Sequence, residues 1–310
     1  MDRPGPTSHQ ATAGGPPVPV RRPAFGLRPG LQPCWTPLRP EFACAANAIS
    51  LLMPHVEPFL VRAVAGRLDG LEPALAAEAR AYVGQESQHH REHRRFNRFL
   101  IGRYPGLGRV DRWAAGTFRR LERRRVSGPA GAAYALAFAT TSETIAYSAA
   151  RWFEGRRRHL LDGADPTLAG LFLWHLAEEV EHKSVAFDVQ LATGVSHWHR
   201  LRAMTFSLVM VLWFVIAGTT VMLWGERRLA HPVAWLRLMG WSLTFGFEVL
   251  PNLATSLLPG YHPAQLTDPL WYEVWLRQLD HEQPPDDGAS AGLRGRPEGS
   301  ATWAYDRPHG

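Results

Sequence analysis

Apolar residues recur along most of the chain at the three- to four-residue spacing of helices, and alternating β-branched runs are scarce. Proline and glycine punctuate this pattern at positions where helices begin or end. The pattern predicts helices over residues 54–68, 71–103, 111–125, 129–159 and 166–192. The fold class expected from the sequence is therefore all-α.

Two later segments are more hydrophobic than the rest. Residues 203–224 contain no charged side chain, and about 20 such residues suffice for a helix to cross a bilayer. Residues 238–258 form a second apolar segment, interrupted by Glu248 and Pro251. We predict that 196–280 is a hydrophobic helical hairpin, appended to the bundle and associated with the membrane. The alternative is that 203–224 is a central buried helix of a soluble bundle, which is unusual for a helix without a polar face.

Both ends of the chain differ in composition from the middle. Residues 1–40 are rich in proline, glycine and arginine, which predicts a disordered or extended arm, and residues 281–310 are predicted to be a disordered tail. The first thirty residues contain no apolar run, so no secretory signal is expected there. Cys34 and Cys44 are the only cysteines, which favours a reducing setting over a disulfide framework. We therefore expect the protein on the cytoplasmic side of a membrane.

The charge balance is basic, with a formal net charge of +6 and a sequence pI of about 9.8. Arginine supplies nearly all of the positive charge, because Lys183 is the only lysine. Arginine clusters at 119–120, 123–125 and 156–158 could bind nucleic acid, anionic lipid or acidic partners, or simply face solvent on a helix. No zinc-finger spacing or RNA-binding aromatic motif accompanies them, so no nucleic acid is expected and the membrane is the favoured partner.

Glutamates and histidines occur in the order Glu, Glu-x-x-His, Glu, Glu-x-x-His, each group on a separate predicted helix. The i, i+3 spacing places the two side chains of each motif on one helix face. Dinuclear carboxylate bundles use this arrangement, with one Glu from each of two helices and a Glu-x-x-His from each of the others. The expected metal ligands are Glu57, Glu86, His89, Glu143, Glu179 and His182. They predict a ferritin-like four-helix bundle over 41–195 that binds two divalent metal ions, with iron favoured and manganese or zinc as alternatives.

Further polar residues surround the two motifs. For hydrolysis, His93 or Glu178 is the candidate general base. His93 is alternatively an added ligand or a hydrogen-bonding partner of the ligands, and Glu178 competes with Glu179 as a ligand because it lies four residues before His182. We expect His90 and His175 to lie outside the ligand set. Asn97 continues the helix face of His93 and is expected to be a polar partner near the site.

The stretch from Gly84 to Asn97 resembles a bacterial family known as predicted metal-dependent hydrolases. The resemblance extends to residues 54–57, 178–183 and 258–263, and covers about 41–275. It implies an all-helical, metal-binding protein. The family name implies hydrolysis without establishing a reaction.

Three functions fit this pattern. The favoured one is oxidation of a hydrophobic or lipid-like substrate at a di-iron site. Because the chain lacks a nicotinamide or flavin motif, electrons would then come from a donor protein. The second is hydrolysis by two metal ions that activate a water, and the third is metal storage or structural support.

Overall fold

The computed structural model describes residues 18–28 and 30–282. In this part of the chain there are ten α-helices, three short 3-10 turns and no β-strand. The prediction of an all-α protein is confirmed. The α-helices are α1 (Pro40–Ala65), α2 (Pro73–Arg103), α3 (Leu107–Arg125), α4 (Pro129–Phe153), α5 (Arg157–Leu161), α6 (Pro166–Glu181), α7 (Val185–Ala192), α8 (His197–Gly225), α9 (Pro232–Ser256) and α10 (Leu270–Glu282).

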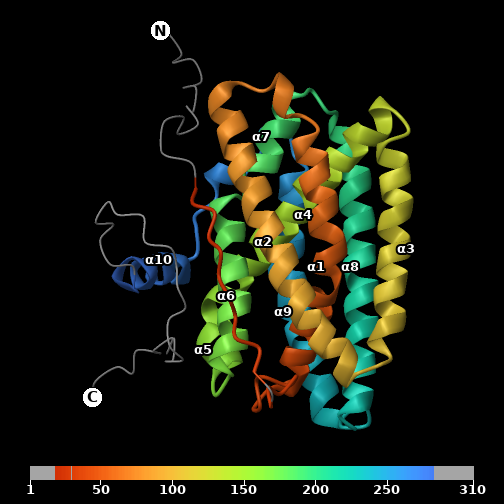
Figure 1. Cartoon of the computed structure of the whole chain (residues 1–310), viewed down its shortest axis with the longest axis vertical. Helices are drawn as coiled ribbons and strands as arrows, with labels where there is room; N and C mark the ends of the chain where they lie inside the picture. The colour runs from red at the N-terminus through yellow and green to blue at the C-terminus, as the bar shows by residue number, and fades with distance from the viewer. Residues whose placement is uncertain (1–17, 29, 283–310) are drawn as a thin grey trace.

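The long helices lie side by side in a bundle (Figure 1). Helix α1 packs against α2, α4 and α8, and α4 packs against α6. Helix α3 runs along the outside and connects α2 to α4, so the helices α1, α2, α4 and α6 form two pairs joined by one long connection. Two-pair bundles with a long crossover are a known solution for burying a site between four helices.

Local sequence signals explain many of the helix boundaries. Proline stands in the first turn of α2, α4 and α6, where its missing N–H costs nothing. The carboxylate of Asp165 caps α6 by accepting hydrogen bonds from the N–H groups of Thr167 and Leu168. The predicted helix from residue 166 to 192 is, however, broken after Glu181, where three turn residues separate α6 from α7.

The first helix corrects a prediction. Helix α1 begins at Pro40 rather than near residue 54, and it contains both Pro54 and Pro58. A proline inside a helix removes the hydrogen bond to the carbonyl four residues earlier. The carbonyl freed by Pro54 is that of Ser50, and it accepts a hydrogen bond of 2.7 Å from Nδ2 of Asn97 on α2. Tertiary contact therefore replaces the bond that the helix loses.

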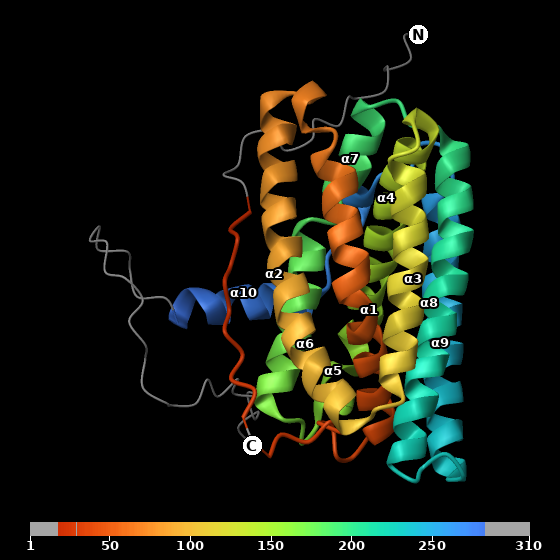
Figure 2. The same cartoon turned by 45° about the vertical axis from the view of Figure 1, so that its right-hand side comes forward.

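The predicted hydrophobic hairpin exists as α8 and α9, but it is not an appendage. Side chains along one face of α8 belong to the same core as the four-helix bundle, among them Met210, Phe214 and Met222. Close packing requires Gly218, because a Cβ there would lie 2.8 Å from Cβ of Ala48 on α1. In Figure 2, α8 and α9 form the side of the bundle opposite α10.

Two stretches, Pro40–Gly70 and His197–Gly225, are long and apolar enough to cross a membrane. Core helices of soluble proteins pass the same test of length and composition, and the first stretch is mostly buried in the bundle. Helix α8 is intermediate, because one face is packed and the other is exposed. The sequence suggested either a membrane span separate from the bundle or a fully buried helix. Helix α8 is neither, since only one of its faces is buried.

The sequence predicts a disordered or extended arm before α1, and its described part is extended and packed on the bundle. Residues 18–28 and 30–39 form an extended strap that runs along α2 and α6 (Figure 1). Trp35 in this strap is only 1% exposed, stacks on Phe172 at 5.0 Å between ring centroids, and donates a hydrogen bond to Asn47. Aromatic burial thus fixes a proline-rich segment that composition alone predicts to be an arm. The disorder expected for 1–17 and beyond Glu282 lies outside the described residues.

Candidate metal centre

The six expected ligands point into the bundle from the helices that pair around its centre. They come from α1, α2, α4 and α6, except that His182 is the residue directly after α6. All six are at most 4% exposed. The tertiary structure therefore brings together every residue of the predicted ligand set, although their role as ligands stays a prediction.

Donor atoms fall into two groups that could each hold a metal ion. One atom from each member of a group lies within 4.8 Å of the others. The first group is Glu57, His89 and His175, and the second is Glu86, Glu143, Glu179 and His182.

Two carboxylates connect these groups. Glu179 Oε1 lies 3.0 Å from His175 Nε2 and 3.8 Å from His89 Nδ1, while Glu179 Oε2 lies 3.3 Å from His182 Nε2. Glu86 Oε1 lies 3.7 Å from His89 Nδ1 and 3.3 Å from His182 Nε2. Both carboxylates thus stand where bridging ligands would be needed between two ions.

The two motif histidines are oriented by hydrogen bonds on their outer nitrogens. Nε2 of His89 donates to the carboxylate of Glu178 at 3.0 Å, so its Nδ1 lone pair faces the site. Nδ1 of His182 donates to Oε1 of Gln85 at 2.9 Å, so its Nε2 lone pair faces the site. The break after Glu181 turns His182 inward, because the backbone at this position leaves the helical conformation.

His175 is the residue that the sequence analysis placed outside the ligand set. It is 9% exposed and belongs to the first group of donors. It lies four residues before Glu179 and seven before His182, and this i, i+4, i+7 spacing places all three side chains on one face of a helix. That longer periodicity is the signal by which the sequence could have identified it.

A chain of hydrogen bonds behind His175 fixes its tautomer. Asn97 donates to the Ser50 carbonyl, so its Oδ1 accepts from the Ser50 hydroxyl at 2.8 Å. The Ser50 oxygen then accepts from Nδ1 of His93 at 2.7 Å, and His93 Nε2 accepts from Nδ1 of His175 at 2.8 Å. The Nε2 lone pair of His175 is left facing Glu179.

Several buried polar atoms of the site make no hydrogen bond within the described residues. They are both carboxylate oxygens of Glu57, both of Glu86, Oε2 of Glu143 and Nδ1 of His89. Buried carboxylates without partners are costly, whereas carboxylate oxygens and imidazole nitrogens are good donors for iron, manganese or zinc. The residues present therefore fit a pair of divalent ions.

Electrostatics of the site agree with this fit. Burial and the charge of Glu179 raise the pKa of Glu143 to about 8. Burial and the charge of Glu86 raise the pKa of Glu57 well above its usual value. Burial opposes protonation of His182, but the charges of Glu179 and Glu143 outweigh it and raise the pKa well above 6.5. A divalent cation would compete with these protons for the same lone pairs.

The two expected general bases are already engaged. Oε1 of Glu178 accepts from Trp174 at 2.9 Å and from Arg21 at 3.1 Å, while Oε2 accepts from His89. Both ring nitrogens of His93 are hydrogen-bonded, and burial with the charge of His175 lowers the pKa of His93 well below its usual value. The geometry places both residues behind candidate ligands, Glu178 behind His89 and His93 behind His175, as hydrogen-bonding partners that orient them. His90 is half-buried and belongs to neither donor group.

Residues 19–267 match the protein family described as "predicted metal-dependent hydrolase". The chain belongs to this family. No curated protein and no solved structure matches it. The matched residues include all eight side chains assigned to the site from the sequence.

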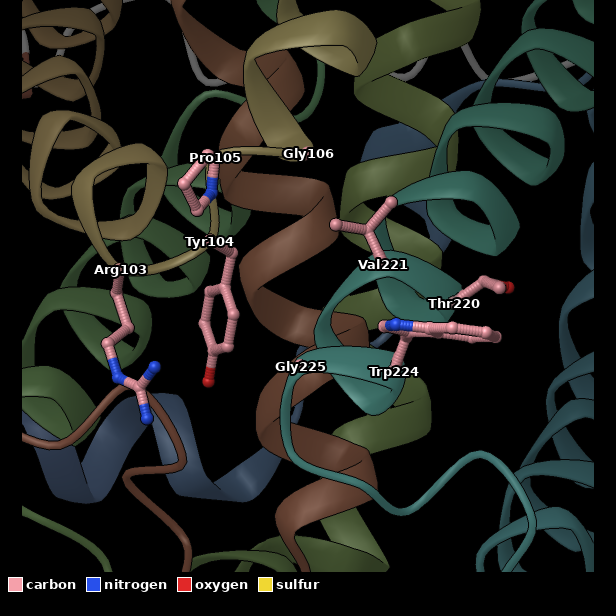
Figure 3. Close-up of a pocket in the computed structure, with 8 residues that line it drawn as sticks. All are labelled: Arg103, Tyr104, Pro105, Gly106, Thr220, Val221, Trp224 and Gly225. Atoms are coloured by element: carbon pink, nitrogen blue, oxygen red, sulfur yellow. The ribbon is translucent and has the colours of Figure 1, made fainter.

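A surface groove at one end of the bundle lies away from these residues. It is formed by Tyr104 and Pro105 after α2 and by Val221 and Trp224 on α8 (Figure 3). Tyr104 is eighteen positions beyond Glu86, which along a helix is roughly 27 Å. This groove is therefore not the mouth of the candidate metal centre.

Proposed function

We propose that the chain is a metal-dependent enzyme with a carboxylate-bridged dinuclear centre, and that it oxidises a hydrophobic substrate. The observation that carries the proposal is the donor set. Seven side chains, the six expected ligands and His175, present carboxylates or imidazole lone pairs to one buried volume. Donor sets of glutamate and histidine that project from four helices are those of di-iron and di-manganese carboxylate proteins.

The surroundings of the donors favour oxidation over hydrolysis. When bound, a pair of iron ions would supply reaction with dioxygen, with electrons from a donor protein. The rings of Trp174 and Tyr82 lie edge-on to His89 and His182, with centroids 4.7 and 4.9 Å apart, and they help exclude water. The Tyr82 hydroxyl also donates to Oε1 of Glu143 at 2.8 Å, which orients that carboxylate.

Hydrolysis is the second candidate, because the family is described as a predicted metal-dependent hydrolase. A hydrolytic site needs a water nucleophile and benefits from a free base. The two bases expected from the sequence, His93 and Glu178, have their hydrogen-bonding atoms occupied. This makes hydrolysis the less favoured reaction.

Metal titration of the full-length protein tests the centre. We expect two divalent ions per chain, and we expect Glu86→Ala or Glu179→Ala to abolish stoichiometric binding. Glu92→Ala is the matched control, since Glu92 is a buried carboxylate on α2 that pairs with Arg91 and Arg95 instead of facing the donors. Unchanged metal content in both site variants would exclude the centre.

The reaction is tested on protein loaded anaerobically with iron, manganese or zinc. Oxidation predicts an absorption band in the iron-loaded protein that changes with oxygen and reductant. Oxygen-independent cleavage of an ester by the zinc- or manganese-loaded protein would instead establish hydrolysis. Loading far beyond two ions per chain would indicate storage.

We also propose that the outer face of α8 and α9 rests on a bilayer, on its cytoplasmic side. Its support is a set of exposed apolar side chains, each more than half exposed: Val209, Leu212, Trp213, Ile216, Leu236, Met239, Leu243, Phe247 and Leu250. An apolar face of this kind is a membrane or partner surface in most proteins. The buried opposite face of α8 favours a helix lying on the bilayer surface over one surrounded by lipid.

A further inference from the structure

The strap before α1 carries a partly buried cation, Arg21, next to the proposed centre. Its side chains alternate, so that those at 21, 23, 25 and 27 are partly buried and those between them are exposed. Arg21 reaches α6, where it makes a double hydrogen bond with Glu181 at 2.7 Å and a bond with Glu178 at 3.1 Å. These pairs raise the pKa of Arg21, although burial opposes this.

One route leads from Arg21 to the first donor group. Nη1 of Arg21 donates to Oε1 of Glu178, and Oε2 of the same carboxylate accepts from Nε2 of His89. Glu178 is fully buried. A buried carboxylate needs a cation or hydrogen-bond donors beside it, so Arg21 helps to hold the Glu178 carboxylate in the position where it accepts from His89.

A second route leads from Arg21 to the second donor group. Both guanidinium Nη atoms donate to the carboxylate of Glu181. Glu181 Oε2 also accepts from Nε2 of Gln85 at 2.7 Å, which turns the other end of that amide, Oε1, toward His182 Nδ1. The Glu181 carboxylate therefore orients the Gln85 amide, and Arg21 holds that carboxylate in place.

We propose that Arg21 is a positioning residue for both motif histidines, so that the strap is part of the metal centre. The inference rests on the proposed dinuclear site. Each route ends on the nitrogen of His89 or His182 that faces away from the donors, and the partner on that nitrogen fixes the tautomer and ring orientation of a ligand. One guanidinium joins the two routes, so its loss weakens the orientation of both rings together.

The fit of the strap to α2 supports a specific position rather than a loose contact. A Cβ on Gly84 would lie 2.7 Å from Cγ2 of Val20, so the strap approaches α2 closely at that point. Gln85 also donates to the carbonyl of Pro19 at 3.2 Å. The guanidinium of Arg21 lies over the ring of Trp275, 5.1 Å from its centroid. Two of these contacts hold the strap against α2, and the third holds the guanidinium against α10.

Cobalt(II) titration of the full-length protein, followed by visible absorption, tests the proposal. Arg21→Gln removes the cation and should weaken cobalt binding by about ten- to one-hundredfold, the usual effect of losing an outer partner of ligand histidines. The absorption bands of both cobalt ions should change. Arg22→Gln is the matched control, because it makes the same charge change at the exposed neighbouring residue and should leave both readouts unchanged.

A second variant separates positioning from anchoring of the strap. Gly84→Val displaces Val20 while retaining Arg21, so it should cost less cobalt affinity than Arg21→Gln if the guanidinium matters more than the strap. Equal cobalt affinity and spectra for Arg21→Gln and Arg22→Gln would overturn the inference while leaving the centre intact. Failure of the unaltered protein to bind cobalt would instead overturn the proposed function.

Discussion

At the residue scale, the site depends on polar side chains that are not among the seven donors but orient them through hydrogen bonds. Asn97 is an example, because it satisfies the Ser50 carbonyl that Pro54 leaves without its helical partner. The same amide receives the Ser50 hydroxyl, and this fixes the direction of the hydrogen bonds through His93 to His175. One amide therefore pairs the carbonyl that Pro54 frees and also sets the tautomer of His175.

A double-mutant cycle tests this coupling. Asn97→Leu leaves the Ser50 carbonyl buried and unpaired, and it should lower the free energy of unfolding by about 1–3 kcal/mol. In a Pro54→Ala background, the helix regains an N–H for that carbonyl, so the cost of Asn97→Leu should be smaller. Chemical denaturation measures all four proteins. Equal costs in the two backgrounds would mean that the proline and the amide are not coupled.

At the scale of elements, α8 is a structural helix of the bundle as well as an apolar surface. Its contact with α1 requires a glycine at residue 218, where an added Cβ would meet Cβ of Ala48 at 2.8 Å and its Cα at 3.3 Å. Neither atom can move without moving the backbone of α1. Gly240 on α9 is the opposite case, because nothing lies within 4 Å of its added Cβ.

Alanine at these two glycines should have effects of opposite sign. Gly240→Ala should stabilise the protein by about 0.5–1 kcal/mol, because alanine restricts the unfolded chain and favours the helix. Gly218→Ala should instead destabilise it by about 1–3 kcal/mol, because overpacking outweighs that gain. Thermal and urea denaturation measure both. A stabilising Gly218→Ala would show that α8 is not packed tightly on α1.

At the scale of the whole molecule, the two sides of the bundle differ. The strap and α10 lie on one side, and the apolar face of α8 and α9 lies on the other (Figure 2). Arg112 and Arg120 line a groove with Trp213 between α3 and α8, where they could meet anionic headgroups at the edge of that face. The proposed membrane contact is thus confined to one side.

Vesicle binding tests whether the membrane contact is confined to the side of α8 and α9. The protein should co-sediment with vesicles of phosphatidylcholine and phosphatidylglycerol, and Ile216→Glu should lower its partition coefficient roughly tenfold or more, because a carboxylate replaces a membrane-facing apolar group. Leu270→Glu is the control, because Leu270 is similarly exposed, at 66% against 54%, but lies at the start of α10 instead of on α8 or α9. Equal losses for both variants, or no vesicle binding by the unaltered protein, would contradict the proposed surface.

The sequence alone determined the helical fold class and the six residues expected to form the site. Both depend on short-range spacing, since apolar residues three and four apart define a helix face and Glu-x-x-His places two donors on one turn. It also determined the hairpin of α8 and α9, because long apolar runs are visible locally. These features need no knowledge of which helix packs on which.

Only the tertiary structure decided the rest, because it depends on contacts between distant segments. Arg21 meets Glu178 and Glu181 across more than 150 residues, so no local pattern marks it. The continuation of α1 through Pro54 is supported by Asn97, and the inclusion of α8 in the core depends on its fit to α1. His175 lies between these cases, because its spacing is local but its burial and tautomer come from α1 and α2.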